Sequence, residues 1–207
     1  MKITVTFRLI VTFFIAAAIL FGVVSLWAKW QAYRAQTDAR ELVAELRGVR
    51  IGGSTLDDVG LVAARHTHYR RSFLKPDPPA CDNGEDPCYF DFSYENSLLA
   101  RLHLAPVIRF GVRVQVHQRR VDAIMEDLTC GNGPSTSGVV INEGLQPFTD
   151  RTIDVSEFSN MPSITTVRLT PNAPERDQIY GLNLKCLDQI GGCPNRSDFL
   201  PGLSQRK

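Results

Sequence analysis

The pattern of hydrophobic and polar positions first marks a long apolar run near the N-terminus. Residues Leu9 to Trp27 include no charged side chain. As a helix this run is roughly 28 Å long, which is close to the thickness of the hydrocarbon core of a bilayer. Trp27 and Trp30 follow at the depth where aromatic side chains favour the membrane interface. We therefore predict a single transmembrane helix over residues 9–28, after a cytoplasmic tail of residues 1–8.

The alternative for this run is a signal peptide that is removed after export. Such a peptide has an apolar region of about 7–15 residues and small residues before its cleavage site. The run here is longer, and the bulky Leu26 and Trp27 stand before the candidate site after Ala28. The pattern therefore favours a retained membrane anchor.

Beyond the predicted span, the apolar positions change to helical spacing. These positions are Leu42, Val43, Leu46 and Val49. We expect a helical stalk over residues 29–50 that continues the transmembrane helix. Gly52 and Gly53 interrupt the pattern, and Ser54 or Thr55 can cap a second helix.

Alternating apolar and polar positions then predict strands. The clearest strand runs from Ile108 to Val116, and a turn at residues 117–120 leads to its hairpin partner, Val121–Thr129. A short helix or turn is expected over residues 96–104, and a C-terminal helix from about Pro174 to Ile190. Further strands are expected at Cys88–Tyr94, Val139–Asn142, Arg151–Val155 and Ile164–Thr170.

This order of elements predicts the fold class. Strands that follow one another in sequence favour an antiparallel sheet, and helices that flank them favour packing on one face. We therefore expect residues 51–207 to form one α+β domain, with an antiparallel sheet that has helices packed on one face.

Composition and charge narrow the choice of partners. The chain has 207 residues and a formal net charge of +1, so no overall field indicates binding to nucleic acid. No phosphate-binding loop, nucleophile elbow or other cofactor motif is present in the sequence, so we expect no cofactor.

The cysteines indicate disulfides. Cys81 and Cys88 have the same spacing as Cys186 and Cys193, with six residues between partners. This spacing is too wide for a zinc knuckle, and the acids between the first pair do not follow the calcium-binding loop pattern. We therefore predict two local disulfides, Cys81–Cys88 and Cys186–Cys193, while Cys130 is either buried or paired between chains.

Disulfides also bear on the compartment, because they persist outside the cytoplasm. The basic residues on the two sides of the apolar run do not decide its orientation. The cysteines favour an exported domain, and so a single-pass protein of the cell inner membrane with its C-terminal domain in the periplasm.

Other titratable residues do not assemble into a recognisable catalytic or metal site. His66 and His68 face different directions on a helix, so we interpret them as solvent-facing residues at a helix end. Asp57–Asp58 and Glu126–Asp127 read as a helix start and a solvated strand end. We therefore predict no catalytic residue and no metal ligand.

One strand and its turn are notably basic. Arg109 and Arg113 share a face, with His117, Arg119 and Arg120 further along the chain. Arginine presents a planar fork of donors that suits carboxylate or phosphate, so these five residues form a candidate site for an anionic group. The alternative is a solvated face, offset by Asp122, Glu126 and Asp127 on the neighbouring strand.

Four motifs together resemble a group of uncharacterised bacterial envelope proteins with an N-terminal anchor and one cysteine-stapled domain. They are LRGVRIGGSTLDDV, CDNGEDPCYFDFSYEN, RLHLAPVIRFGVRVQV and LNLKCLDQIGGC. The first motif also resembles, locally, the helix start of small outer-membrane assembly lipoproteins of the BamE type, although this chain lacks their lipobox cysteine. The resemblance implies placement and topology rather than an activity.

The sequence thus favours a membrane-anchored, extracytoplasmic binding or interaction module that is not catalytic. Its expected partners are the membrane, through the N-terminal helix, and an envelope protein or an anionic polymer. The alternative is an envelope hydrolase or lipid-modifying enzyme without a recognisable motif.

Overall fold

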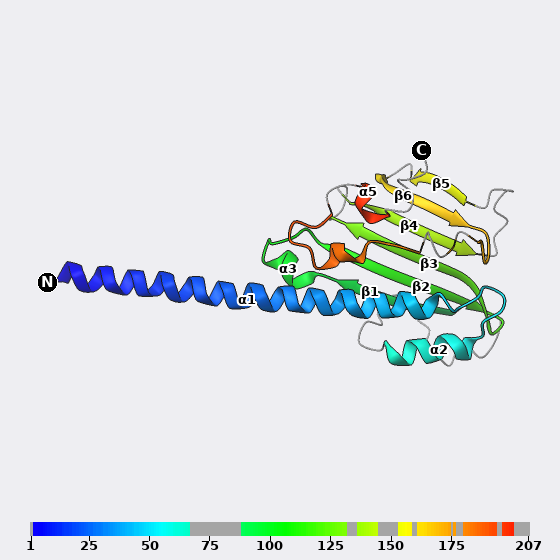
Figure 1. Ribbon diagram of the computed structural model, residues 1–207, viewed down its shortest axis with the longest axis horizontal. Helices are drawn as coiled ribbons and strands as arrows, with labels where there is room; N and C mark the ends of the chain where they lie inside the picture. The colour runs from blue at the N-terminus through cyan, green and yellow to red at the C-terminus, as the bar shows by residue number, and fades with distance from the viewer. Residues whose placement is uncertain are drawn as a thin grey trace.

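The computed structural model is an α+β structure in which a long helix enters a domain built on one sheet (Figure 1). It describes residues 2–66, 88–131, 136–144, 153–158, 161–174, 176, 180–193 and 196–200. The helices are α1 (Lys2–Leu46), α2 (Leu56–Arg65), α3 (Ser97–Arg101), the 3-10 helix η4 (Leu184–Leu187) and α5 (Arg196–Phe199). The strands are β1 (Cys88–Glu95), β2 (Ile108–His117), β3 (Arg120–Cys130), β4 (Ser137–Gly144), β5 (Ile153–Phe158) and β6 (Met161–Leu169).

The sheet has six strands in the order β1-β2-β3-β4-β6-β5. All neighbouring strands are antiparallel except β4 and β6, which are parallel. The prediction of an antiparallel sheet is therefore wrong at this pair. Alternation along a strand indicates which side chains are buried but not which strand lies beside it, and here β6 inserts between β4 and the edge strand β5.

The predicted β2–β3 hairpin is confirmed, with Val112 opposite Glu126 at its centre. Its turn places Gln118 and Arg119 at φ values of 50° and 62°. Two consecutive residues with positive φ are typical of a type I′ turn, whose twist matches that of the flanking strands. The hairpin end also pairs with the segment before α2, where the backbone N–H of Gly52 donates to the carbonyl of Val121 at 2.8 Å.

The second helix begins as the sequence predicts. The hydroxyl of Thr55 accepts from the backbone N–H of Asp58, and the carboxylate of Asp58 accepts from the backbone N–H of Thr55. This reciprocal capping box satisfies donors that would otherwise lack partners at the start of α2. The Thr55 hydrogen bonds lower the pKa of Asp58.

The expected C-terminal helix over Pro174–Ile190 is wrong. Among the described residues of this range, only Leu184–Leu187 forms a named helix, and it is a short 3-10 helix. Gly181 lies in the middle of the range, and an interior glycine disfavours a helix. The apolar residues instead reach the core from this short 3-10 helix and the irregular residues before it, with Leu182, Leu184 and Leu187 all buried.

The N-terminal part of α1 is exposed, whereas its C-terminal part is in the core. Leu26 is 72% exposed, but Ala28 is 1% exposed, so packing against the domain begins directly after the apolar run. The stretch of Phe7–Leu46 contains a window that is long and apolar enough to cross a membrane. Small residues recur along the packed face at Ala28, Ala32, Ala35 and Ala39, and they let the helix approach closely.

The segment predicted as a stalk, residues 29–50, is thus helical as far as Leu46 but not separate from the domain. Leu42 and Leu46 are fully buried in the same core as Phe110 and Ile124 of the sheet. Gln36 also donates to the carboxylate of Asp188 at 3.2 Å, which ties α1 to the segment after η4. One helix therefore runs without a break from the exposed apolar part into the core.

Candidate binding face of the sheet

The two faces of the sheet differ in what covers them. On β2, Phe110, Val112 and Val114 are buried on the face that packs against α1. Arg109 and Arg113 occupy the alternate positions of the strand, so their side chains point to the opposite face, where Arg109 is exposed and Arg113 is half-buried. Of the helices that the structure describes, α1, α2, η4 and α5 all contribute to the core on the first face. The second, outer face therefore presents the predicted basic side chains.

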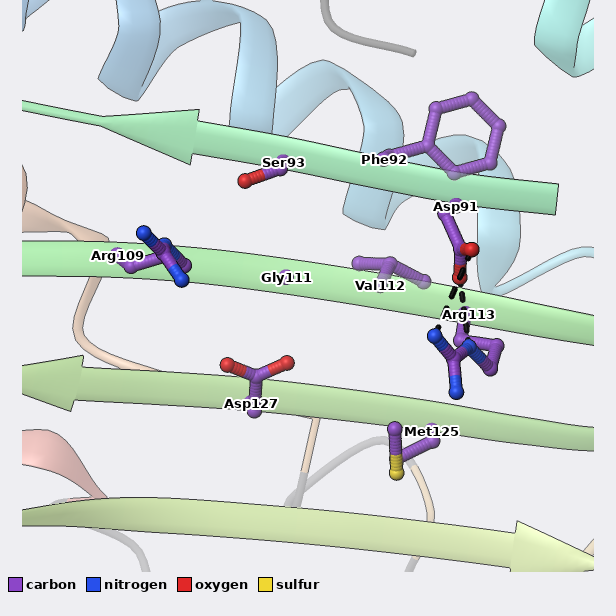
Figure 2. Close-up of a pocket in the computed structure, with 9 residues that line it drawn as sticks. All are labelled: Asp91, Phe92, Ser93, Arg109, Gly111, Val112, Arg113, Met125 and Asp127. Atoms are coloured by element: carbon purple, nitrogen blue, oxygen red, sulfur yellow. Dashed lines mark hydrogen bonds and ion pairs between the residues drawn. The ribbon is translucent and has the colours of Figure 1, made fainter. Parts of the chain in front are cut away.

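A shallow hollow of about 210 Å³ lies on this outer face, centred on Gly111 of β2 (Figure 2). Arg109 and Arg113 flank the glycine along the strand, and Asp127 of β3 lies beside it. A Cβ atom at position 111 would overlap the Asp127 carboxylate. The absence of a side chain at Gly111 thus makes room for the Asp127 carboxylate, which lies over the glycine.

The two flanking arginines pair with acids of β1, which lie opposite them in the register of the sheet. Arg113 Nε donates to Asp91 at 2.6 Å, and its guanidinium also lies 5.5 Å from the ring centre of Tyr89. The hydrogen bond to Asp91 raises the pKa of Arg113. Arg109 is half-exposed and meets Glu95 at 3.4 Å, which is a weaker contact.

Asp127 adds a second carboxylate to the hollow. Burial raises its pKa, and the nearby positive charges of Arg109 and Arg113 oppose that shift. The hollow therefore combines two guanidinium groups with the carboxylates of Asp91 and Asp127, and its charge is nearly balanced.

The other three predicted residues lie at the far end of the hairpin. Arg109 lies eight residues before His117, the last residue of β2, and this length of strand is about 26 Å at roughly 3.3 Å per residue. Arg119 contacts Asp57 at 3.4 Å, and Arg120 Nη1 donates to the carbonyl of Gly52 at 3.3 Å. His117 belongs to the same end of β2. The structure thus brings Arg109 and Arg113 to one hollow and separates them from His117, Arg119 and Arg120.

The acids expected to offset the basic face behave differently from one another. Asp122 accepts from Gln115 at 2.8 Å on the outer face. Glu126, in contrast, has no exposed surface and lies on the core face. Its interpretation as part of a solvated strand end is wrong. The alternation Ile124, Glu126, Leu128 contained this signal, because Glu126 occupies an apolar position of the pattern.

The prediction for His66 is also wrong, since its side chain is only 7% exposed. The ring packs edge-on against Phe92, and its Nδ1 lies 3.4 Å from the hydroxyl of Tyr94. Its Nε2 lies 3.6 Å from the carboxylate of Glu45 on α1. His68 lies outside the described residues. Within the described ranges, no group of three or more potential metal ligands occurs.

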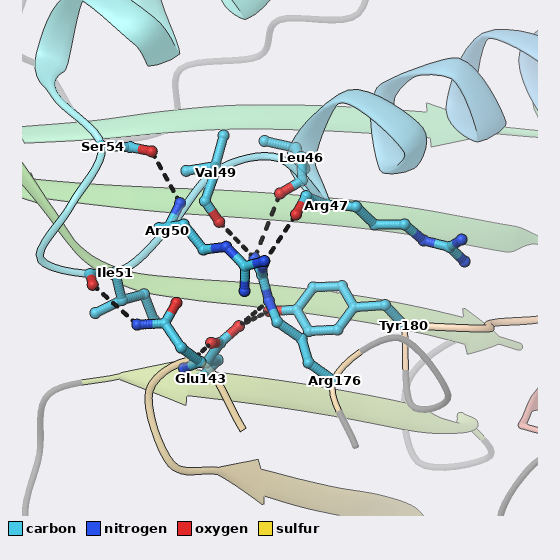
Figure 3. A network of polar contacts seen from close by, with 10 residues as sticks. Leu46, Arg47, Val49, Arg50, Ile51, Ser54, Glu143, Arg176 and Tyr180 are labelled. Carbon is cyan, nitrogen blue, oxygen red and sulfur yellow. Dashed lines mark hydrogen bonds and ion pairs between the residues drawn. The ribbon is translucent and has the colours of Figure 1, made fainter. Parts of the chain in front are cut away.

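Sequence reasoning missed a buried polar network on the core face (Figure 3). Glu143 of β4 accepts from Arg176 Nε at 2.7 Å and from the hydroxyl of Tyr180 at 2.6 Å. Burial raises the pKa of Tyr180 well above its ordinary value, so the hydroxyl stays protonated and donates. The residues of this network come from distant parts of the chain, so no local sequence motif predicts them.

Arg176 also caps the C-terminal end of α1. Its guanidinium donates to the carbonyls of Leu46, Arg47 and Val49, at 3.3, 3.0 and 2.7 Å. Carbonyls at the end of a helix lack partners within the helix, and a cation at this end is favourable. Since Arg176 is held by Glu143 at the same time, the end of α1 is joined to the centre of the sheet.

Glu126 lies near this network without belonging to it. Neither carboxyl oxygen has a hydrogen-bond partner among the described residues. Burial raises its pKa from 4.5 to about 8, while Arg176 and Arg47 oppose the shift. The side chain is therefore mainly protonated at neutral pH, and its lack of exposed surface separates it from any substrate.

Four of the five cysteines lie in the described residues. The Cys186–Cys193 disulfide is confirmed. Cys88 takes part in a disulfide, but Cys81 lies outside the described residues, so the Cys81–Cys88 pairing stays a prediction. Cys130 is free and buried, and burial raises the pKa of its thiol.

No protein-family model, curated protein or solved structure matches this chain. The resemblance to envelope proteins that the sequence motifs indicate therefore stays a prediction.

Proposed function

We propose that this protein is a membrane-anchored interaction module that binds an anionic group of an envelope partner through the hollow around Gly111. The observation that carries the proposal is the difference between the two faces of the sheet. One face is filled by the continuation of the anchor helix, and the outer face presents Arg109 and Arg113 beside a position without a side chain. The module is proposed to lie in the periplasm, attached to the inner membrane by α1.

The binding mode follows from the contacts within the hollow. Arg109 is half-exposed and holds Glu95 only at 3.4 Å, so its guanidinium can exchange this acid for a ligand at small cost. The ion pair of Arg113 with Asp91, at 2.6 Å, holds the second guanidinium in place. A carboxylate or phosphate that contacts Arg109 would gain charge-assisted hydrogen bonds, and a partner with several anionic groups could place a second one at Arg113.

The size of the hollow favours a group on a larger partner over a whole small molecule. Its volume of about 210 Å³ is below the range of roughly 300–1,000 Å³ that is usual for ligand pockets. The enzyme alternative would require a perturbed acid that reaches substrate. Glu126 has the raised pKa but no exposed surface, so the observations favour binding over catalysis.

Binding by the full chain in zwitterionic nanodiscs tests this proposal, with polyglutamate and polyphosphate as carboxylate and phosphate probes. We expect binding that weakens with salt and falls several-fold in the Arg109→Gln, Arg113→Gln double variant. The matched control is Arg119→Gln with Arg120→Gln, which removes the same charge at the far end of the hairpin and should bind like wild type.

Arg109→Gln alone guards against a folding defect, because it leaves the Arg113–Asp91 pair intact. Equal binding by wild type and the Arg109, Arg113 double variant would contradict the proposed site. Equal losses in both double variants would reduce the effect to net charge and would also contradict it.

A further inference from the structure

The end of the domain where α1 emerges carries a second, smaller apolar cluster. Ala28 and Ala32 of α1 pack with Leu99 of α3, and all three are almost completely buried. Half-buried apolar residues surround them, namely Leu98, Leu102, Leu104 and Ala105. In Figure 1, α3 lies beside α1 at the end of the sheet that faces the free N-terminal part of the helix.

The position of this cluster along α1 determines its height above a membrane. Ala28 directly follows Trp27, the last residue of the uncharged run. At 1.5 Å per residue, Ala28 and Ala32 lie about 1.5 and 7.5 Å beyond Trp27. The headgroup layer of each leaflet is roughly 5–8 Å thick. If α1 crosses a bilayer, α3 and the loop after it lie at the level of the headgroups.

A second segment reaches the same end of the domain. The backbone N–H of Gly191 donates to the carbonyl of Leu104 at 3.1 Å, so the tip of the Cys186–Cys193 loop lies against the segment after α3. This tip presents Ile190, which is 60% exposed. An exposed isoleucine at headgroup level can insert its side chain at the boundary of the acyl chains, which removes this apolar surface from water.

The polar groups at this level also suit lipid headgroups. Trp27 and Trp30 contact each other, with ring centres 4.9 Å apart, and the guanidinium of Arg34 lies over the Trp30 ring. Arg101 is exposed at the end of α3. Aromatic rings and basic side chains both favour the membrane interface, the latter through lipid phosphates.

We propose that Ser97–Pro106 and Ile190 form a juxtamembrane patch that rests in the headgroup layer of the bilayer crossed by α1. This inference depends on the membrane anchor of the proposed function, but it does not depend on the binding hollow or on the side of the membrane. The bilayer is the occupant because the patch is continuous with the anchor helix at the level where lipid begins.

Depth-dependent quenching tests the juxtamembrane patch. A fluorescent amino acid is placed at Ile190 or at Arg101, both exposed, in the full chain reconstituted in phosphatidylcholine–phosphatidylglycerol vesicles. The matched control is Leu61 of α2, an apolar side chain of similar exposure (64%) on another element. We expect lipids brominated near the headgroup to quench the probes at Ile190 and Arg101 several-fold more than the probe at Leu61.

Fluorescence of the native Trp27 and Trp30 is recorded in the same samples and separates the two proposals. If lipid quenches these tryptophans but quenches all three probes equally, the juxtamembrane patch is overturned and the anchor stands. If the tryptophans are not quenched, the membrane anchor fails and the patch fails with it. If the probe at Ile190 is shielded from water in cells but not in vesicles, a protein partner covers this position, and the juxtamembrane patch is overturned.

Discussion

Glu126 is an acidic residue whose side chain is completely buried. It faces Val112 across the β2–β3 pair and lies in an apolar core, without a hydrogen-bond partner in the described part of the chain. Desolvation penalises a buried carboxylate, and the protein responds by keeping the group protonated. A buried acid of this kind lowers stability at neutral pH relative to a neutral side chain of the same shape.

The raised pKa of Glu126 predicts how stability depends on pH. Between 4.5 and about 8, the folded protein retains a proton that the unfolded chain has released. The free energy of unfolding therefore falls as the pH rises through this window and levels off above it. Glu126→Gln should remove this part of the dependence and be more stable than wild type at pH 8, by a few kcal/mol in order of magnitude.

Denaturant unfolding of the full chain in detergent micelles, at several pH values, measures this difference. Glu41→Gln, at an exposed position of α1, is the matched control and should follow wild type. Curves for Glu126→Gln and wild type that stay parallel from pH 5 to pH 8 would show that Glu126 does not titrate in this window.

At the scale of elements, the β2–β3 turn uses residues that do not suit its geometry. Gln118 and Arg119 both adopt positive φ, where Asn and Gly are strongly preferred in a type I′ turn. The double change Gln118→Asn, Arg119→Gly should therefore raise the free energy of unfolding by about 1 kcal/mol. Denaturant unfolding measures this gain, and a stability equal to or below that of wild type would refute it.

The double change also removes the contact between Arg119 and Asp57. Both side chains are mostly exposed, so this ion pair contributes little. Asp57→Asn removes the same contact without changing the turn, and it separates the two effects.

The sequence predicts individual elements well where one side of the element is exposed to solvent. The β2–β3 hairpin, the start of α2 and the Cys186–Cys193 disulfide all follow from alternation, capping residues and spacing. Its failures lie where distant segments meet. The parallel β4–β6 pair and the Glu143–Arg176 network depend on contacts that no local pattern encodes. The failed C-terminal helix differs, because the interior Gly181 was a local signal against it.

The candidate site was predicted in part for the same reason. Alternation placed Arg109 and Arg113 on one face, but sheet register decided that their acids come from β1. The expected group of five basic residues does not form. Arg119 and Arg120 contact Asp57 and the carbonyl of Gly52 at the turn, and His117 lies at the end of β2 outside the hollow. Glu126 was misassigned because its charge was given more weight than its place in the pattern.

At the scale of the whole molecule, the proposed membrane anchor is α1, and the orientation of the domain can be measured. If the domain is exported, alkaline phosphatase fused after Lys207 should be active in bacterial cells, because that enzyme requires an oxidising compartment. The protein should also stay in the membrane fraction after alkaline washing. An inactive fusion, with an active cytoplasmic reporter at the same position, would reverse the proposed orientation.

The contact of Arg176 with the last carbonyls of α1 has a consequence for how the protein meets its partners. A domain on a flexible tether searches a volume set by the length of its linker, and its effective concentration at any one site is low. Here the proposed tether is the core helix, held by Arg176 and Glu143, so in an anchored protein the outer face would have a fixed position relative to α1. A partner in the same membrane would meet a face that has already lost most of its rotational freedom, which reduces the entropy cost of binding.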